Sequence, residues 1–392
     1  MRILHLTPYY KPAYAFGGVV RAVEGIATAL VRRGHEVTIL TTDALDQQGR
    51  RIAAPEETIG GIRVLRRPNA LPRLRARCNL STPRSMKKTA EAILPGVDVL
   101  HAHEFRTLEN LLVTPGAQRL NVPILLSPHG TLNLNTGRGR LKTAWDRLLS
   151  PAIAQRIDHV IALTDAERTE AETLWKSFGT RQRPTQFSVI PNGVDLGQFD
   201  KSVMAKAFHK RYHLAEAPTV LFMGRLQARK GVDLLIKAFK AADVADARLL
   251  IVGPDEGMLP ALRALANGDP RIVFTGYLAG DARLGALAAC NVFALPATGE
   301  GQPIAALEAM AAGLPVLLSP GCHLDEVDGA GAGFVVDAAV AAFAEKLRLL
   351  LTDQAMRHEV GERARRLAEE RYAWDGIAER LENVYQSLLG SS

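Results

Sequence analysis

The chain of 392 residues is 47% hydrophobic and 23% charged, a composition typical of a globular protein with a sizeable core. Single hydrophobic cores rarely grow beyond about 250–300 residues, so the length excludes a single small domain and predicts two domains of similar size. The net charge of +7 is uneven, because residues 1–192 hold 27 Lys and Arg against 16 Asp and Glu, whereas residues 193–392 hold 21 against 25.

Cysteine usage and hydropathy indicate the compartment. Cys78, Cys290 and Cys322 lack the close spacing of a metal or redox motif, which fits a reducing environment. The N-terminus enters a strand-like segment directly, without a signal-peptide pattern, and no uncharged apolar stretch reaches 18 residues. We therefore expect a cytoplasmic protein that does not span a membrane.

Strand-like apolar runs alternate with helix-like periodicity along the chain. In the first half, strands are expected at 3–7, 37–41, 97–102, 123–127, 160–164 and 187–190, and helices at 19–33, 85–94, 108–120, 142–154 and 165–176. In the second half, strands are expected at 219–223, 248–252, 272–275, 292–295 and 316–318, and helices at 201–212, 232–241, 258–266, 284–288, 304–312, 340–351, 354–371 and 374–388. This alternation predicts an α/β fold with two doubly wound, Rossmann-like parallel sheets.

Turn-forming residues at 191–195 separate the two sets of strands. We expect one domain over residues 1–192, a second over 193–373, and a C-terminal helix over 374–392 that could cross back to the first domain. Ligands of such sheets bind beyond the carboxyl ends of the strands. Two domains facing each other would therefore place the site in the cleft between them.

Between Glu57 and Glu91 the chain has no acidic residue, and this basic segment, residues 63–88, attracts polyanions such as nucleic acid or an anionic membrane leaflet. A solvated basic loop is the alternative. Interleaved Leu71 and Leu74 favour the edge of a membrane, and the segment lacks the aromatic residues on which nucleic-acid bases stack. The basic residues are Arg63, Arg66, Arg67, Arg73, Arg75, Arg77, Arg84, Lys87 and Lys88.

Two glycine-containing loops follow predicted strands and precede helices. Gly17 and Gly18 stand before the helix at 19–33, where free backbone amides could approach an anion, although a plain turn is the alternative. The loop at 224–231 contains Arg225 and Lys230, whose forked and point-charge donors suit a diphosphate. An exposed basic turn is the alternative for this second loop.

Glu300 and Glu308 flank the start of a helix that is apolar on every other face. Pro303 suits its first turn, and the positive end of the helix favours an anion. A helix that is apolar all round is normally buried, and a buried carboxylate needs a polar partner, so Glu308 is expected to meet a ligand hydroxyl or a fixed internal partner. The backbone amides that open the helix are those of Gly301, Gln302 and Ile304.

These segments together resemble the retaining glycosyltransferases of family 4, which have the GT-B fold. The resemblance extends from Ile3 to the final helix, and the family usually has Phe where Gln302 stands. The matching segments are the Gly-Gly pair at 17–18, Ser-Pro-His-Gly at 127–130, Ile-Pro-Asn-Gly-Val-Asp at 190–195, the loop at 224–231, and the Glu-x7-Glu element with the Ala-Met-Ala-Ala-Gly-Leu-Pro-Val that follows it.

The resemblance implies roles for these residues in binding a nucleoside-diphosphate sugar, UDP- or GDP-linked, without a metal or other cofactor. Arg225 and Lys230 would neutralise the leaving diphosphate, Glu308 would hold the ribose, and Glu300 would bind sugar hydroxyls. His129 would face the donor sugar, although a lone histidine at a strand end is otherwise structural. The loop that would meet the nucleobase contains Gly276, Tyr277 and Leu278.

His103 and Glu104, in His-Ala-His-Glu at 101–104, would lie on the acceptor side. Two histidines and a glutamate could also suggest a metal site, but no third histidine is evident nearby in the sequence, so we expect no metal. No pair of carboxylates flanking an anomeric carbon can be identified, which argues against a glycosidase-like double displacement. The resemblance instead implies retention, with the leaving phosphate taking the proton of the acceptor.

The basic segment and the basic loop at 131–142 suit an anionic acceptor. We expect a glycan linked to polyprenyl diphosphate at the inner face of the cell membrane, in bacterial surface polysaccharide or glycolipid biosynthesis, and a soluble sugar or sugar phosphate is the alternative. Two other functions stay open: a nucleotide-sugar 2-epimerase of the same architecture, and a non-catalytic polyanion-binding protein. Nucleic acid is not expected as a partner.

Overall fold

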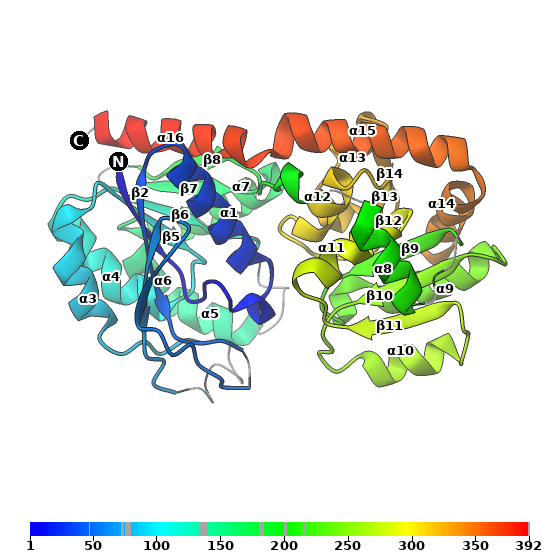
Figure 1. Cartoon of the computed structure of the whole chain (residues 1–392). Coiled ribbons are helices and arrows are strands. Elements are labelled where there is room, and N and C mark those ends of the chain that lie inside the picture. Colours follow the sequence, from blue (N-terminus) through cyan, green and yellow to red (C-terminus); the bar gives the residue numbers. More distant parts are fainter. Residues whose placement is uncertain are drawn as a thin grey trace. The chain divides into compact units, whose positions relative to one another are not determined.

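The structure is a computed structural model that describes residues 1–46, 48–71, 74, 80–133, 139–179, 184–199, 202–212, 214 and 217–390. The chain divides into two compact units (Figure 1). Unit 1 comprises Met1–Gly193 and Trp374–Ser392, and unit 2 comprises Val194–Ala373. Each unit contains a twisted sheet with helices packed against it, which confirms the predicted α/β fold with two such sheets.

Unit 1 is built on an eight-stranded sheet with the order β3-β4-β2-β1-β5-β6-β7-β8. Neighbouring strands are parallel except β3 and β4, an antiparallel hairpin that turns at Gly60 and Gly61. This hairpin was not expected from the sequence, because its short strands carry several charged side chains. The strands are β1 (Arg2–Leu6), β2 (Glu36–Thr42), β3 (Glu56–Ile59), β4 (Ile62–Arg67), β5 (Val99–His103), β6 (Ile124–Ser127), β7 (His159–Ala162) and β8 (Gln186–Val189).

Helices cover this sheet, and successive strand residues point to different cores. Leu4 belongs to one hydrophobic cluster, and its neighbour Ile3 belongs to another that includes residues of α1 and α16. The helices are α1 (Gly18–Arg32), α3 (Met86–Ile93), α4 (Leu108–Arg119), α5 (Gly139–Leu148), α6 (Ser150–Ala154), α7 (Asp165–Ser177) and α16 (Trp374–Gly390). The expectation of one helix over 142–154 is wrong, because two helices meet at Leu149. Pro151 cannot continue the first helix and instead lies in the first turn of α6.

The C-terminal helix α16 packs along α1 (Figure 1). Its first residue, Trp374, lies so close to two glycines that a Cβ on Gly25 or Gly193 would come within 2.1 or 2.4 Å of the indole. Further along α16, Glu382 Oε1 pairs with His35 Nε2 at 2.5 Å. The last helix of the chain is therefore part of the unit that contains the N-terminus.

Unit 2 is built on a six-stranded parallel sheet with the order β11-β10-β9-β12-β13-β14. Numbered within the unit, this is the doubly wound order 3-2-1-4-5-6, and the direction of strand addition reverses between β9 and β12. The three-residue strand β14 was not expected from the sequence. The strands are β9 (Thr219–Met223), β10 (Arg248–Val252), β11 (Ile272–Gly276), β12 (Val292–Leu295), β13 (Val316–Leu318) and β14 (Gly333–Val335).

A single large hydrophobic cluster fills unit 2 on both faces of its sheet. Its helices are α8 (Ser202–Tyr212), α9 (Val232–Ala242), α10 (Leu259–Ala266), α11 (Gly280–Ala289), α12 (Ile304–Ala311), α13 (Glu326–Gly329), α14 (Val340–Thr352) and α15 (Gln354–Tyr372). Helix α11 begins at Gly280, four residues before the helix that the sequence predicts. Within the part of the chain that is described, no helix combines the length and the apolar character needed to cross a membrane.

Some side chains of the basic segment, residues 63–88, form ion pairs with acidic residues and are not free to bind a polyanion. Arg66 is 1% exposed, pairs with Glu57 across the β3–β4 hairpin and donates through Nη2 to the carbonyl of Lys11 at 2.7 Å. Arg63 pairs with Glu56 at 2.7 Å. The hairpin thus brings in acidic partners that lie outside the basic segment. Arg84, Lys87 and Lys88 are exposed, whereas Arg73, Arg75 and Arg77 lie outside the described residues.

Candidate functional site

The predicted binding residues of unit 2 lie at the carboxyl ends of its strands. The loop with Arg225 and Lys230 follows β9, and the loop with Glu300 follows β12. These two strands are neighbours in the sheet, and strand order reverses between them. The carboxyl side of such a reversal is where doubly wound sheets bind their ligands.

Close packing of backbone fixes the start of the β9 loop. The amide of Gly224 donates to the carbonyl of Val252 at 2.9 Å, and a Cβ on Gly253 would lie 1.7 Å from the carbonyl oxygen of Gly224. Beyond this point, Arg225 Nη1 donates to Glu256 Oε1 at 3.0 Å, and Gln227 also bonds this carboxylate. Glu256 was not identified from the sequence, and it holds the guanidinium of Arg225 in place.

The second cation of the loop meets the carboxylate of the neighbouring loop. Lys230 Nζ donates to Glu300 Oε2 at 2.6 Å, and the two side chains are about one-tenth exposed. Arg229 Nη1 lies 3.6 Å from Glu300 Oε1 and donates to the carbonyl of Gly299 at 2.8 Å. The sequence predicted Lys230 and Glu300 as separate contacts of one ligand, and the structure brings them together. Arg229 lies in the same loop but was not predicted.

Two cations around one carboxylate leave a net positive charge in a partly buried place. Opposite charge and low solvent exposure favour the binding of an anion such as a diphosphate. Glu300 Oε1 accepts no hydrogen bond from the residues that the structure describes, although Arg229 is near. This oxygen is an available acceptor for a ligand hydroxyl.

Glu308 lies on α12 and is 8% exposed, so the predicted burial of this carboxylate is confirmed. It forms an ion pair with Arg283 of α11, which is 7% exposed, and this is the internal polar partner that burial requires. Arg283 was not predicted from the sequence, because its helix was expected to begin at residue 284. Nε and Nη1 of Arg283 find no hydrogen-bond acceptor among the described residues, although Nη1 is close to Glu308.

The loop before α12 differs slightly from expectation. Pro303 has extended backbone angles, with φ −75° and ψ 108°, and caps the helix from outside its first turn. The helix begins with Ile304, and Gln302 is 8% exposed. The amide of Glu300 donates to the carbonyl of Gly321 at 2.9 Å, which ties this loop to the residues after β13.

The segment expected to meet a nucleobase begins with the last residue of β11. Gly276 has φ +73°, and its carbonyl accepts a 2.9 Å hydrogen bond from the amide of Gly253. Tyr277 is 47% exposed, whereas Leu278 is buried. Two strand spacings, or about 10 Å, separate β11 from β9, and both Tyr277 and the β9 loop come directly after the carboxyl ends of these parallel strands.

The other predicted residues belong to unit 1. Gly17, with φ +103°, precedes Gly18 at the start of α1. His129 follows β6 and has φ +56°. Next to it, the amide of Gly130 donates to Glu167 Oε1 at 2.5 Å, while the amide of Leu163 donates to Oε2 at 2.8 Å. Glu167 was not identified from the sequence, and burial raises its pKa to about 7.

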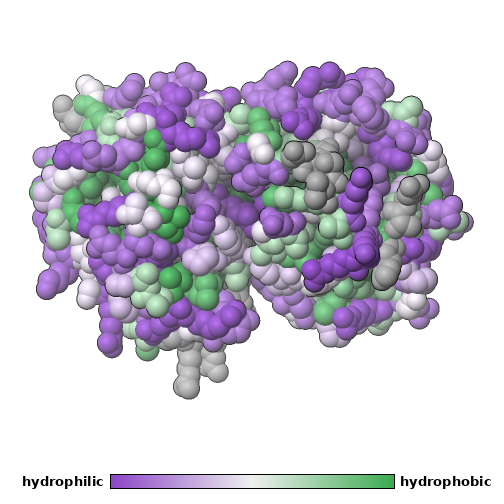
Figure 2. Space-filling model, in the orientation of Figure 1, coloured by the Kyte–Doolittle hydropathy of each residue, from purple (hydrophilic) through white to green (hydrophobic). Residues whose placement is uncertain are grey.

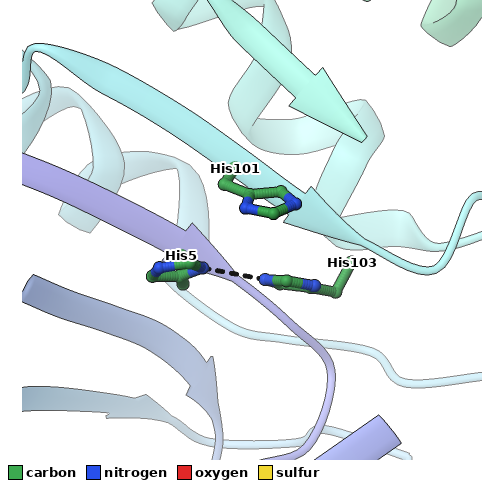
Figure 3. A group of neighbouring side chains, drawn as sticks. All are labelled: His5, His101 and His103. Carbon is green, nitrogen blue, oxygen red and sulfur yellow. Dashed lines mark hydrogen bonds between the residues drawn. The ribbon is translucent and has the colours of Figure 1, made fainter. Parts of the chain in front are cut away.

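Buried histidines cluster near the carboxyl ends of β1 and β5 in unit 1 (Figure 3). His5 Nδ1 lies 2.8 Å from His103 Nε2, and His103 Nδ1 lies 2.9 Å from His129 Nε2. The expectation that no further histidine lies near His103 is wrong, because β1 and β5 pair in register and bring His5 beside His101. Glu104 follows with φ +63°, and its amide donates to the carbonyl of Ser127 at 2.9 Å.

One ring nitrogen from each of His5, His101 and His103 lies within 4.8 Å of the other two, a spacing close enough for one metal ion to be considered. Two nitrogens bound tetrahedrally to zinc at 2.0–2.1 Å stand about 3.3 Å apart. His5 and His103 are closer than that, as hydrogen-bonded rings are. Both nitrogens of His101 are engaged as well, with Tyr385 Oη at 2.7 Å and Ser127 Oγ at 2.8 Å. The arrangement is one of hydrogen-bonded imidazoles, and the absence of a metal stays a prediction.

Burial shifts these rings toward the neutral form. Desolvation lowers the pKa of His5 to about 3 and that of His129 to about 4. The pKa values of His101 and His103 are also lowered well below the usual range, first by burial and then by the neighbouring rings. All four imidazoles are therefore neutral at physiological pH.

Family models match both units. The model for glycosyltransferase family 4 matches residues 16–198, and the model for glycosyl transferases group 1 matches residues 205–367. The phosphatidyl-myo-inositol mannosyltransferase of Mycobacterium tuberculosis is 28% identical over 407 residues, which cover 100% of this chain and 98% of the relative. The D-inositol 3-phosphate glycosyltransferase of Kineococcus radiotolerans is 29% identical over 424 residues, covering 98% and 93%.

Solved structures show the same fold. The Anabaena protein HepE, crystallised in complex with UDP-glucose, superimposes with a TM-score of 0.75 at 20% identity. The match covers 99% of this chain and 100% of the other. The two parallel-sheet units therefore have the GT-B architecture.

Proposed function

Because the chain belongs to the family 4 glycosyltransferases and has the GT-B fold, we propose that it transfers a sugar from a nucleoside-diphosphate sugar to a glycan or glycolipid acceptor with retention of configuration. The observation that carries this proposal is the grouping of Lys230, Arg229 and Glu300 at the strand reversal of unit 2. That grouping offers positive charge for a diphosphate and a carboxylate oxygen for a sugar hydroxyl within one small region.

In this proposal unit 2 binds the donor. Lys230 and Arg225 neutralise the diphosphate as it leaves, a task that a divalent ion performs in other transferases, and no metal is required. Glu308 accepts hydrogen bonds from the ribose, while Arg283 forms an ion pair with the same carboxylate. Glu300 binds hydroxyls of the donor sugar. The nucleobase meets the residues at the end of β11, which are Gly276, Tyr277 and Leu278. The sugar and the diphosphate are supported by the loop that leads into α12, which contains Gly301, Gln302, Pro303 and Ile304.

Unit 1 contributes the acceptor side. The amides of Gly17 and Gly18 at the start of α1 contact an anionic group, and His129 contacts the sugar being transferred. Neutral His129 donates or accepts a hydrogen bond there without adding charge. The leaving phosphate takes the proton of the acceptor hydroxyl, because no pair of carboxylates that could flank the anomeric carbon has been identified among the described residues.

The acceptor is proposed to be lipid-linked. The names of the relatives include phosphatidyl-myo-inositol, a lipid, and inositol 3-phosphate. Helix α5 of unit 1 buries none of its residues completely, and Leu141 and Leu148, seven residues apart, are 56% and 75% exposed. Elsewhere in unit 1, Lys87 and Lys88 of α3 are exposed and basic. On the face of the molecule drawn in Figure 2, hydrophilic side chains predominate and hydrophobic ones form small groups.

Binding of nucleotides tests the donor site first. Isothermal titration of the full chain with UDP, GDP and ADP should reveal one preferred nucleotide, and Arg225→Ala and Lys230→Ala should each weaken its binding. The preferred nucleotide decides which nucleotide sugars are then tested as donors. Turnover with these donors should persist in EDTA. Release of nucleoside diphosphate with a retained anomer, followed by NMR, supports the proposal. Formation of an epimer without release of nucleoside diphosphate would identify the 2-epimerase instead.

Vesicle sedimentation tests the acceptor side. Vesicles that contain anionic lipid should retain the protein at physiological salt, and neutral vesicles should not. Lys87→Glu with Lys88→Glu should reduce retention, and Leu148→Ser should do the same by removing an apolar contact. Lys237→Glu, an exposed change on α9 of unit 2, is the matched control. Equal retention of all variants would remove the membrane from the proposal while leaving the donor site intact.

A further inference from the structure

One buried carboxylate of unit 1 links the loops that follow two neighbouring strands. Glu167 lies in the first turn of α7 and is 3% exposed. Its Oε1 accepts a hydrogen bond from the amide of Gly130 at 2.5 Å, and its Oε2 accepts one from the amide of Leu163 at 2.8 Å. Gly130 follows β6 and Leu163 follows β7, and these strands are parallel neighbours in the sheet. A single side chain therefore connects two loops at the carboxyl edge of this sheet.

Capping of α7 does not account for this arrangement. Thr164 caps the helix, because its hydroxyl accepts a hydrogen bond from the amide of Glu167 at 3.2 Å. In the usual capping box, a glutamate at this third position returns the bond to the amide of the cap residue. Glu167 instead bonds the residue before the cap and Gly130, which lies 37 residues earlier in the sequence. Its Oε1 therefore holds the loop after β6 and not its own helix.

The amide of Gly130 belongs to a backbone segment that needs support. His129 and Gly130 have φ values of +56° and +73°, in the left-handed region that is unfavourable for a residue with a Cβ. The peptide unit between them carries the N–H that Glu167 binds, and this unit is attached to the Cα from which the His129 side chain projects. A hydrogen bond to a carboxylate is stronger than one between neutral groups, so this contact stabilises His129 in its left-handed conformation.

The two residues that follow in this loop have a separate anchor. The guanidinium of Arg106 donates to the carbonyls of Thr131 and Leu132 at 2.7 and 3.0 Å. Loss of the Glu167 carboxylate should therefore release the peptide unit between residues 129 and 130 while residues 131–132 stay attached.

We propose that Glu167 is a positioning residue for sugar transfer, which fixes the backbone of His129 through the amide of Gly130. The inference rests on the proposed function, in which His129 contacts the donor sugar. Glu167 itself is buried, so its effect on transfer passes through this loop. The residues proposed to bind the nucleoside diphosphate belong to unit 2, and their affinity for it should not depend on Glu167.

Hydrogen exchange of the Gly130 amide tests the contact in the full chain without added ligand. Exchange should be slow in the wild type, and Glu167→Ala should accelerate it about 10- to 100-fold, the effect of a hydrogen bond to a charged group. Thr164→Ala is the matched control, because it removes the cap of the same helix but keeps the Glu167 carboxylate. In this control the Gly130 amide should stay protected. Exchange at Gly130 that is equally fast in the wild type and in Glu167→Ala would overturn the inference.

Turnover tests the positioning. With the preferred nucleotide sugar, Glu167→Ala should lower kcat/KM for release of nucleoside diphosphate about tenfold or more, while the Kd of the nucleoside diphosphate stays within about twofold. His129→Ala should lower kcat/KM as well, and adding Glu167→Ala to it should cause little further loss, because Glu167 acts through His129. Thr164→Ala should keep wild-type turnover. Losses that multiply in the double variant would overturn the inference.

Glu167→Gln is the variant to use if the alanine variant does not fold. Its one carbonyl oxygen can accept a hydrogen bond from either amide, and exchange shows which amide keeps its bond. If Gly130 loses protection, kcat/KM should fall, and if Gly130 stays protected, kcat/KM should stay near the wild-type value. Any other combination would overturn the inference.

The same measurements separate this inference from the proposed function. A wild type that releases no nucleoside diphosphate from any nucleotide sugar would contradict the proposed function, and the inference with it. Multiplied losses in an active transferase would contradict the inference alone.

Discussion

Lys230 Nζ and Glu300 Oε2 form a 2.6 Å hydrogen-bonded ion pair between the loops that follow β9 and β12. Each of these side chains is proposed to contact a ligand, and the two also bind each other. A bound diphosphate would compete with Glu300 for the ammonium and would free the carboxylate for sugar hydroxyls. The pairing also gives each of two partly buried charges a partner of opposite sign.

The first prediction concerns the charge of Lys230. Lys230→Ala should weaken binding of the preferred nucleoside diphosphate about 10- to 100-fold, because a charge-assisted hydrogen bond contributes about 1.5–3 kcal/mol. Binding of the corresponding nucleoside, which lacks phosphates, should change little. Isothermal titration measures both, with Lys237→Ala of α9 as the control. An equal loss for nucleoside and nucleoside diphosphate would show that Lys230 acts on the fold and not on the phosphates.

The second prediction separates the structural and ligand roles of the buried pair Arg283 and Glu308. Arg283→Ala leaves a buried carboxylate without its partner and should destabilise the protein by about 3–5 kcal/mol. Arg283→Met with Glu308→Met replaces both charges by apolar groups, which often preserves stability. Calorimetry should therefore find the double variant more stable than the single one, and titration should find its nucleotide affinity reduced about tenfold or more.

Arg365→Ala of α15 is the control for this pair, because its partner Glu369 and Arg365 itself are both about two-fifths exposed, and such a pair contributes about 0–1 kcal/mol. Wild-type nucleotide affinity in a stable double variant would exclude Glu308 from ribose binding.

Much of this architecture follows from local patterns, and the rest follows from contacts between distant segments. Alternating apolar runs and the glycine loops predicted most strands and the position of the β9 loop. The partner of Glu308 could not be predicted, because Arg283 becomes its neighbour only when α11 and α12 pack together. His5 and His103 likewise depend on the pairing of β1 with β5, since 98 residues separate them in the sequence.

The third prediction is a pH dependence that comes from Glu167. Burial raises its pKa to about 7, while an unfolded glutamate titrates near 4.5. Between these values the folded state binds more protons than the unfolded state, so the contribution of Glu167 to stability decreases as pH rises from about 4.5 to about 7. The decrease approaches about 3 kcal/mol at neutral pH.

The measurement compares thermal unfolding of the wild type and Glu167→Gln at pH 5 and pH 7.5. The amide cannot accept hydrogen bonds from both Gly130 and Leu163, so the variant should be less stable at pH 5. Its deficit should shrink by about 2–3 kcal/mol at pH 7.5, because the variant does not titrate. A deficit that stays constant or grows with pH would show that Glu167 is ionised in the folded protein throughout this range.

The fourth prediction concerns the attachment of α16 to unit 1. A methyl group on Gly25 would lie 2.1 Å from the indole of Trp374, whereas the same addition at Gly376, two residues further along α16, meets nothing within 4 Å. Gly25→Ala should therefore displace Trp374 and destabilise unit 1 by about 1–3 kcal/mol or more. Gly376→Ala should stabilise the helix by about 0.5–1 kcal/mol, since alanine loses less backbone entropy. Calorimetry should find Gly25→Ala less stable and Gly376→Ala more stable than the wild type. Limited proteolysis should cleave the C-terminus faster in the first variant and more slowly in the second. Faster cleavage of both variants would contradict the packing of Trp374 against Gly25.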